Sequence, residues 1–264
     1  MFFVDEYLHK VKTVSDSVAL TDQDGKRNFT YGQLDSLSDQ IANRLISRGV
    51  GAGDSVIILL PRITEYIACE IALLKIGAVI VPLIPEYPAD RVEYIKKDCN
   101  AVLIIRESFL DGTGELQDEA PERPEISDDG RAMIIYTSGS TGTPKGVVYT
   151  RGNIDAQVIR RMDCVRDITP LVYAASSTLS FCVSVTEYFR TLAMGGHVHI
   201  LSNDVRSDAA LPSAYYVKHQ IAAGFIAPRV LRNFKCKSDS LKRVFAGGEK
   251  IVNSYSPDYE TVAL

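Results

Sequence analysis

Apolar runs alternate with amphipathic helical segments along the first hundred residues, and this rhythm restricts the fold more than any other feature. Val56–Leu60 is an uninterrupted apolar run closed by Pro61, as expected of a strand that is buried on both faces. Shorter apolar runs follow at 78–81 and 101–105, and helical segments at 64–76 and 88–98 separate the runs. Because parallel strands need such crossovers, the pattern predicts an α/β fold with parallel-rich sheets flanked by helices.

An earlier helix is marked at its start by a local hydrogen-bonding signal. Thr30 and Gln33 have the spacing of a capping box, in which each side chain satisfies a backbone donor of the other residue. Apolar residues then recur at helical spacing as far as Ile46, and Gly49 supplies a stop signal. The sequence therefore predicts a helix that begins directly after Thr30.

Residues 107–130 interrupt the rhythm and suggest a division of the chain. This stretch is rich in Asp and Glu, with Arg123 as the one base, and is expected to be a solvated surface linker. Strand-like runs resume afterwards, at 132–136, 171–175, 197–201, 224–227 and 241–246. We therefore expect a first α/β subdomain over 1–106, the acidic linker over 107–130 and a second α/β subdomain over 131–264.

Composition excludes several classes of protein. The 29 Lys and Arg against 33 Asp and Glu give a net charge of −4, so there is no basic excess to bind nucleic acid. With 46% hydrophobic residues the chain is neither disordered nor fibrous. The most apolar stretch, 67–85, contains Glu70, Lys75 and Pro82 and is not expected to enter a membrane. Five scattered cysteines without a C-x-x-C pair indicate reduced thiols and a cytoplasmic location.

The segment richest in chemistry is Tyr136–Gly146, where an apolar strand runs into glycines, hydroxyl side chains and a lysine. Glycines allow the backbone to curl so that several N–H groups point toward one anion, and Lys145 adds a positive charge. The spacing differs from that of a Walker A loop. Composition alone leaves two interpretations open, a phosphate-binding loop and a flexible Gly/Ser turn.

The order of several motifs resolves that ambiguity. The stretch TSGSTGTPKGV (137–147) resembles the signature loop of adenylate-forming enzymes, which join a carboxylate to AMP. The stretch PLIPEYPADRVEYIK (82–96) is similar to a segment of the adenylation domains of nonribosomal peptide synthetases. Further motifs of this family match in the right order at 29–34, 180–189, 246–249 and 253–262. The resemblance implies about the first half of the large N-terminal domain of such an enzyme.

The resemblance also implies where ATP and magnesium would bind. In this family the signature loop closes over the β- and γ-phosphates, which implicates Thr137, Ser138, Gly139, Ser140, Thr141, Gly142 and Lys145. The adenine would lie along Gly247, Gly248, Glu249, Asn253, Tyr255 and Ser256. Glu260 matches the magnesium-binding glutamate of the family, and a carboxylate suits that hard cation. Thr137, Lys145 and Glu260 are the expected catalytic residues.

The expected acyl pocket departs from the family at one position. The resemblance places Phe181, Cys182, Val183, Thr186 and Ala246 around the substrate. Cys182 stands where amino-acid-activating members carry an aspartate that pairs with the substrate ammonium. A thiol cannot neutralise that charge, and an unpaired buried ammonium would cost several kcal/mol. Either the substrate lacks a free α-amine, as an aryl or hydroxy acid does, or another acid compensates, or the site is degraded.

The remaining expectations concern partners and completeness. Family members transfer the acyl group to the phosphopantetheine thiol of a carrier protein, so a carboxylic acid and a carrier protein are the expected partners. The family's small C-terminal domain has no counterpart here, and an intervening helix is missing between Lys250 and Asn253. A truncated chain is expected to be inactive alone. One alternative function is therefore a nucleotide-binding half-domain without turnover. A second alternative is an acyl- or aryl-CoA ligase. Arg151 replaces a histidine found in many relatives.

Overall fold

The computed structural model describes residues 1–22, 24–112, 119–138, 143–208, 210–250 and 258–264. Its strands form two separate sheets, one of five strands and one of seven. All strand pairs are parallel except the hairpins β6–β7 and β1–β2. The expected α/β fold with parallel-rich sheets is therefore confirmed.

The five-stranded sheet contains the most apolar strands of the chain. Every residue of β3 and β4 is buried, as the uninterrupted apolar run predicts for strands covered on both faces. In spatial order the strands are β5 (Leu103–Ile105), β3 (Ser55–Leu59), β4 (Val79–Leu83), β6 (Arg131–Ser138) and β7 (Pro144–Thr150). The sheet therefore ends, on one side, in the antiparallel hairpin that carries the signature loop.

The seven-stranded sheet joins the two ends of the chain. Its first strand, β1, pairs in parallel with β9, which lies almost 180 residues later, with Leu20 opposite Val198. In spatial order the strands are β12 (Glu260–Ala263), β11 (Arg243–Ala246), β10 (Ala223–Phe225), β8 (Val172–Ala175), β9 (His197–Ile200), β1 (Val18–Asp22) and β2 (Arg27–Thr30). Residues 18–30 thus belong to the sheet of the C-terminal half.

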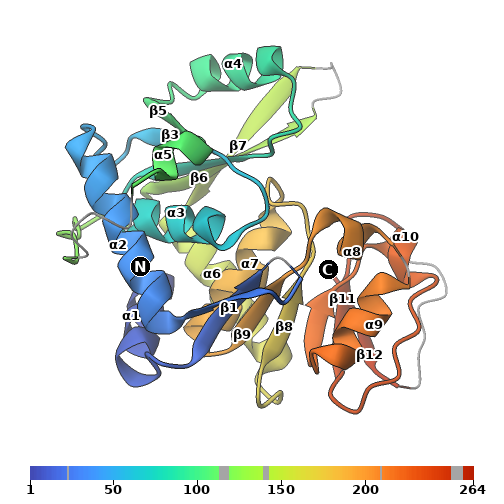
Figure 1. Ribbon diagram of the computed structural model, residues 1–264. Coiled ribbons are helices and arrows are strands. Elements are labelled where there is room, and N and C mark those ends of the chain that lie inside the picture. The colour runs from blue at the N-terminus through green and yellow to red at the C-terminus, as the bar shows by residue number, and fades with distance from the viewer. Residues whose placement is uncertain (23, 113–118, 139–142, 209, 251–257) are drawn as a thin grey trace.

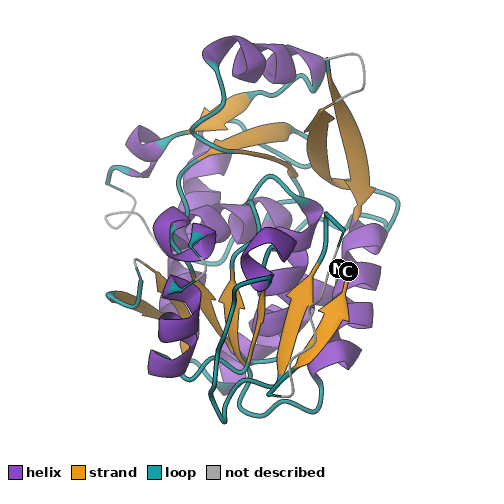
Figure 2. Ribbon diagram, turned by 90° about the vertical axis from the view of Figure 1, so that its right-hand side faces the viewer, coloured by secondary structure: helices purple, strands orange, loops and turns teal. Residues whose placement is uncertain are grey.

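Helices cover both sheets and fill the space between them (Figures 1 and 2). Between the sheets lie α1 (Phe2–Thr13), α2 (Tyr31–Ser47), α3 (Thr64–Lys75), α6 (Arg151–Met162) and α7 (Cys182–Ala193). Outside the five-stranded sheet lies α4 (Ala89–Asp98). The remaining pieces are α5 (Glu107–Leu110), the 3-10 turn η2 (Asp163–Val165), α8 (Asn203–Ser207), α9 (Leu211–Lys218) and α10 (Pro228–Leu231).

The largest apolar core lies in this central helical layer. Phe3 of α1 and Phe189 of α7 stack with ring centroids 4.0 Å apart, and neither side chain is exposed. Lys75, at the end of α3, is buried in the same layer, where its ammonium bonds Asp35 at 2.7 Å and Asp39 at 2.5 Å. The layer is therefore held both by aromatic packing and by a buried charge network.

Most predicted elements are confirmed, whereas their distribution between sheets was not foreseen. The helices after Thr30, at 64–76 and at 88–98, and the strands named above, appear within a few residues of their expected bounds. Part of the acidic stretch forms α5. The two sheets do not follow the expected subdomain division at 107–130. Strands β1 and β2 precede that stretch but join the seven-stranded sheet, and β6 and β7 follow it but join the five-stranded sheet. Strand partners are chosen by long-range packing, which local periodicity does not encode.

The capping box provides a first testable prediction. The Thr30 hydroxyl accepts a hydrogen bond from the Gln33 N–H at 3.2 Å, and the Gln33 amide accepts one from the Thr30 N–H at 2.9 Å. Thr30→Ala should therefore lower the free energy of unfolding by about 1 kcal/mol in urea denaturation. Thr13→Ala is the control, because that exposed hydroxyl bonds back to the carbonyl groups of His9 and Lys10 within α1. Equal effects of the two substitutions would contradict the capping role.

Candidate functional site

The β6–β7 hairpin presents the ends of the signature loop at the edge of the five-stranded sheet. Thr137 pairs with Lys145 and Ser138 with Pro144, so both strands are regular up to the loop. The Lys145 side chain is exposed, and no ion pair to it is found among the described residues. Gly139, Ser140, Thr141 and Gly142 lie outside the described residues. The structure thus places the exposed Lys145 ammonium and Thr137 at the strand ends that the loop connects.

The position of the hairpin is fixed by contacts with α4. The Tyr136 hydroxyl donates to the Asp98 carboxylate at 2.6 Å, and the Tyr94 hydroxyl donates to the Pro144 carbonyl at 3.4 Å. Because β6 runs parallel to β4, the loop follows the carboxyl end of a parallel strand. Ligands of open α/β sheets bind at that end, so the loop has the expected location for a phosphate site.

The predicted adenine segment lies at the carboxyl end of β11. Gly247 has no room for a side chain, because an added Cβ would lie 2.8 Å from the Leu264 carbonyl oxygen. Gly248 has a φ of +85°, a left-handed conformation that glycine adopts without strain. Glu249 is exposed beyond this turn. Asn253, Tyr255 and Ser256 lie outside the described residues.

The expected acyl pocket centres on the first turn of α7. Cys182 is the first residue of the helix and is half-buried beside Tyr149 of β7. Burial, followed by the neighbouring Cys182 thiol, raises the pKa of the Tyr149 hydroxyl above its ordinary value. Phe181, the residue before α7, is 49% exposed, so its aromatic ring is accessible to solvent. The structure therefore brings Cys182 and Phe181 to one place, together with a tyrosine that the sequence did not indicate.

The other predicted pocket residues are engaged elsewhere. Val183 packs against the cluster around Phe245, on the side of α7 that faces the seven-stranded sheet. The Thr186 hydroxyl donates to the Val183 carbonyl at 2.8 Å, within its own helix. Ala246 is fully buried at the end of β11. These three residues are packed or hydrogen-bonded within the protein, whereas Cys182 and Phe181 are the more accessible residues of the expected pocket.

A buried glutamate fixes the turn that leads into α7. The Glu187 carboxylate accepts hydrogen bonds from the backbone N–H groups of Ser176 and Ser177, both at 3.1 Å, and from the Ser177 hydroxyl. Burial raises the pKa of Glu187, while these donors oppose the rise. No role was predicted for this residue from the sequence. The available signal was that Glu187 is the one acidic residue of α7, five residues after Cys182.

Two arginines stabilise the same turn by donating hydrogen bonds to its backbone carbonyl groups. Arg62, in the loop after β3, donates to the carbonyl groups of Ala175 and Leu201, each at 2.8 Å, and to that of Ser177. Arg206 donates to the Ser176 carbonyl at 2.8 Å. The turn before α7 is therefore fixed by charged side chains from three separate elements.

The predicted magnesium ligand lies at the opposite end of its strand. Glu260 opens β12, and its carboxylate accepts a hydrogen bond from Arg243 Nε at 2.6 Å. Gly247 lies four positions beyond Arg243, the partner of Glu260, so Glu260 is about 13 Å away along the strand. Within the described residues no group of three His, Cys, Asp or Glu could hold a metal ion. The Glu260 carboxylate is thus engaged by Arg243, away from the Gly247 turn, and its magnesium role stays a prediction.

The histidines form a packed cluster rather than a metal site. His197 Nε2 lies 2.6 Å from the Thr21 hydroxyl, and His199 Nδ1 lies 2.9 Å from the Tyr215 hydroxyl. With His219 they line a cavity of about 570 Å³ at the amino ends of the parallel strands. Burial lowers the pKa of His197 to about 4 and that of His199 to about 3. The cavity lies at the amino ends of these strands, whereas the Gly247 turn lies at the carboxyl end of β11 in the same sheet.

Comparisons with known proteins show the family to which the chain belongs. Residues 8–261 match the family described as AMP-binding enzyme, and the chain belongs to that family. It is 34% identical over 96% of its length to a probable non-canonical nonribosomal peptide synthetase, CymA, of Salinispora arenicola (strain CNS-205). It is 30% identical, over the same share, to bacitracin synthase 1 of Bacillus licheniformis. These matches cover only 3% and 5% of the two synthetases.

Solved structures show the same fold. The N-terminal domain of FACL13 from Mycobacterium tuberculosis superposes with a TM-score of 0.88 at 18% identity, over 99% of this chain and 74% of that one. The N-terminal subdomain of Klebsiella oxytoca NpsA gives a TM-score of 0.83 at 22% identity, over 98% and 71%. Within the described residues, no helix has both the length and the apolar character needed to cross a membrane. All five cysteines are free.

Proposed function

We propose that this chain forms part of a ligase that activates a carboxylic acid as its acyl-adenylate and releases pyrophosphate. The observation that carries the proposal is the β6–β7 hairpin, which has Thr137 and the exposed Lys145 at the carboxyl end of a parallel strand. Membership of the AMP-binding family supports the choice of ATP as the nucleotide. A sequence of glycines and hydroxyl residues next to the exposed Lys145 ammonium suits a polyphosphate.

The proposed reaction requires positioning and charge stabilisation. A substrate carboxylate oxygen attacks the α-phosphorus of ATP, and an oxygen–phosphorus bond forms between them. The bond from the α-phosphorus to the oxygen that bridges to the β-phosphorus breaks, and pyrophosphate leaves with that oxygen. Lys145 offsets the charge that develops on the departing pyrophosphate, and the Thr137 hydroxyl donates a hydrogen bond to it. The chain supplies no covalent nucleophile and no proton transfer in this step. No step is assigned to magnesium, because Glu260 is paired with Arg243.

We infer that the substrate is an aryl or hydroxy acid without a free α-amine. Cys182 and Tyr149 offer a thiol and a phenol in place of a carboxylate. The nearest buried acid on α7, Glu187, already accepts three hydrogen bonds from Ser176 and Ser177. A carboxylate committed in this way is poorly suited to pair with a substrate ammonium. An acid panel of matched amino, hydroxy and aryl acids distinguishes these substrates.

We further propose that the acyl group passes to the phosphopantetheine thiol of a carrier protein, in the cytoplasm. The similarity to CymA and bacitracin synthase 1 supports this partner. The scattered free cysteines support the location. The transfer would need the C-terminal domain that the resemblance implies for the whole enzyme. A nucleotide-binding half-domain without turnover, and an acyl- or aryl-CoA ligase, are the alternatives.

Replacement of Lys145 tests the proposal. Because an ammonium–phosphate hydrogen bond contributes about 1.5–3 kcal/mol, Lys145→Ala should weaken ATP binding by about 10-fold to 100-fold. Titration calorimetry with ATP measures this change. Lys242→Ala is the control, since that exposed lysine precedes β11 at the amino ends of the strands and bonds the Asp239 carbonyl.

Acid-dependent ATP–pyrophosphate exchange separates the candidate functions. Exchange with aryl or hydroxy acids supports adenylation of the inferred substrate class, whereas exchange with amino acids alone would contradict the role assigned to Cys182. ATP binding without exchange would identify the nucleotide-binding half-domain. Acyl-CoA formation in place of carrier loading would identify the CoA ligase. If Lys145→Ala and Lys242→Ala bind ATP equally well, the hairpin is not the phosphate site.

A further inference from the structure

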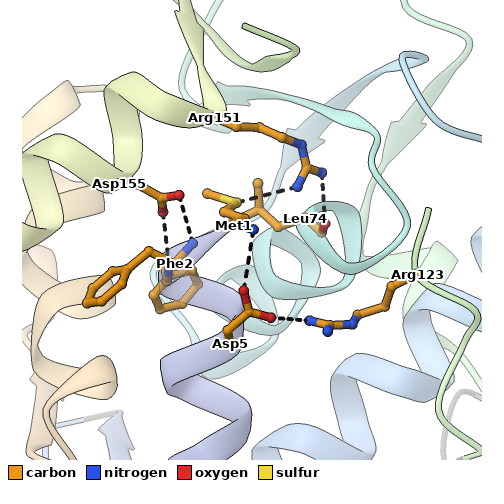
Figure 3. A network of polar contacts seen from close by, with 8 residues as sticks. Met1, Phe2, Asp5, Leu74, Arg123, Arg151 and Asp155 are labelled. Atoms are coloured by element: carbon orange, nitrogen blue, oxygen red, sulfur yellow. Dashed lines mark hydrogen bonds and ion pairs between the residues drawn. The ribbon is translucent and has the colours of Figure 1, made fainter. Parts of the chain in front are cut away.

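A polar cavity separate from the adenylation site lies where α1, α3 and the start of α6 meet the segment 121–127. Its volume is about 940 Å³, and its apolar lining includes Val4, Leu74 and Ile126. The guanidinium groups of Arg151 and Arg123 reach this space from opposite sides (Figure 3). A volume of this size accommodates a small organic molecule.

Arg151 is a buried cation whose donors are incompletely satisfied. The side chain is only 5% exposed. One terminal nitrogen donates to the Leu74 carbonyl at 3.0 Å, and the other contacts the Met1 sulfur at 3.6 Å (Figure 3). Nε is buried and has no hydrogen-bond partner among the described residues. A guanidinium carries five N–H donors and a thioether is a weak acceptor, so most of the hydrogen-bonding capacity of Arg151 is unused.

The surrounding carboxylates do not neutralise this guanidinium directly. Asp155, one turn along α6, accepts the backbone N–H groups of Phe2 at 2.8 Å and Phe3 at 3.0 Å. Asp5 is paired with Arg123 at 2.9 Å. In the part of the chain that the structure describes, no carboxylate lies within 4 Å of the Arg151 nitrogens. One remaining lining charge is the Met1 ammonium, which lies 3.4 Å from Asp5. The others are Lys75, which is paired with Asp35 and Asp39, and the exposed Glu125.

We propose that this cavity binds a small organic molecule through a carboxylate or phosphate group held by Arg151. The oxygen atoms of such a group accept hydrogen bonds from the guanidinium and supply acceptors that the described residues do not. The apolar lining takes the remainder of the molecule. Glu125, at the edge of the cavity, opposes the anion and limits its affinity.

The cavity is distinct from the proposed phosphate loop. Arg151 lies six positions after Lys145, directly after the end of β7, which at roughly 3.3 Å per position is about 20 Å. The two sites therefore lie at opposite ends of the same strand. A molecule bound at Arg151 does not contact the nucleotide, so its binding can be tested independently of catalysis.

Titration calorimetry with three probes, at constant ionic strength in chloride, tests the proposal. The probes are inorganic phosphate, phenyl phosphate and benzoate, which separate phosphate recognition from carboxylate recognition. We expect one-to-one binding of phenyl phosphate or benzoate with a Kd near or below about 1 mM. Arg151→Gln should weaken it by about tenfold or more, and Arg151→Lys should restore part of the loss. Arg160→Gln, an exposed change on the same helix, should leave it unchanged.

A second variant avoids any effect on folding. Glu125 is exposed, so Glu125→Gln should preserve the fold and tighten binding several-fold by removing the opposing charge. The proposal is overturned if no probe binds, if Arg151→Gln and Arg160→Gln bind alike, or if Glu125→Gln leaves the affinity unchanged. Binding that Lys145→Ala abolishes would belong to the signature loop and would also overturn the proposal. Loss of ATP binding with intact probe binding would affect only the proposed adenylation function.

Discussion

Replacing Phe189 with alanine should lower the free energy of unfolding by about 3–5 kcal/mol, because the side chain is wholly buried at the centre of the helical layer. Its ring stacks on Phe3 at 4.0 Å and meets the edge of Tyr188 at 5.3 Å. Alanine would leave a cavity between α1 and α7 and remove both aromatic contacts. Urea denaturation monitored by circular dichroism measures the loss.

A matched pair of variants makes this prediction specific. Phe189→Leu retains most of the apolar volume and should lose clearly less stability than Phe189→Ala. Val217→Ala, on α9, removes a side chain that is 49% exposed and should change the stability by less than about 0.5 kcal/mol. A loss below about 1 kcal/mol for Phe189→Ala would show that this contact is not part of the core.

The second large effect concerns Glu70, a buried carboxyl group that the proposed mechanism does not use. Glu70 lies on α3 with no exposed surface, and neither of its oxygens has a well-formed hydrogen bond. Burial raises its pKa from the ordinary value of 4.5 to about 8, and the neighbouring hydroxyl groups of Tyr188 and Tyr66 oppose the rise. The folded protein therefore holds a neutral carboxylic acid at pH 7.

The direction of the pH effect follows from proton binding. Between about pH 5 and pH 8 the folded state keeps the Glu70 proton and the unfolded state has lost it, so stability falls as the pH rises. The limit of this loss, reached above pH 8, is on the order of 5 kcal/mol for a pKa raised from 4.5 to about 8. Glu70→Gln, which is neutral at every pH, should be as stable as the parent near pH 5 and several kcal/mol more stable near pH 9.

Denaturation curves across this pH range check the Glu70 prediction. Glu93→Gln is the control, because Glu93 is 53% exposed on α4 and its ion pair with Lys97 is worth less than about 1 kcal/mol. The difference between Glu70→Gln and the parent should grow with pH, while that for Glu93→Gln stays flat. A constant difference would mean that Glu70 does not titrate between its two states in this range.

Part of the candidate site could be predicted because its signals are local. The glycines and hydroxyl residues after β6, the turn at Gly247 and the helix that opens at Cys182 each occupy a few consecutive residues. By contrast, Tyr149, Arg62 and Glu187 reach the same region from separate elements. Their side chains are brought together by folding alone. The pairing of Glu260 with Arg243 was not predicted for the same reason, since it depends on the register of β12.

The sequence by itself determined the kinds of element, the α/β class and the family, because strand and helix periodicity, capping and ordered motifs depend on neighbouring residues. Only the tertiary structure decided that β1 lies beside β9, that Arg62 and Glu187 hold the turn before Cys182, and that Arg151 is buried against Leu74. Those outcomes depend on which distant surfaces exclude water together and which polar groups remain to be paired. That choice is a property of the whole packed chain.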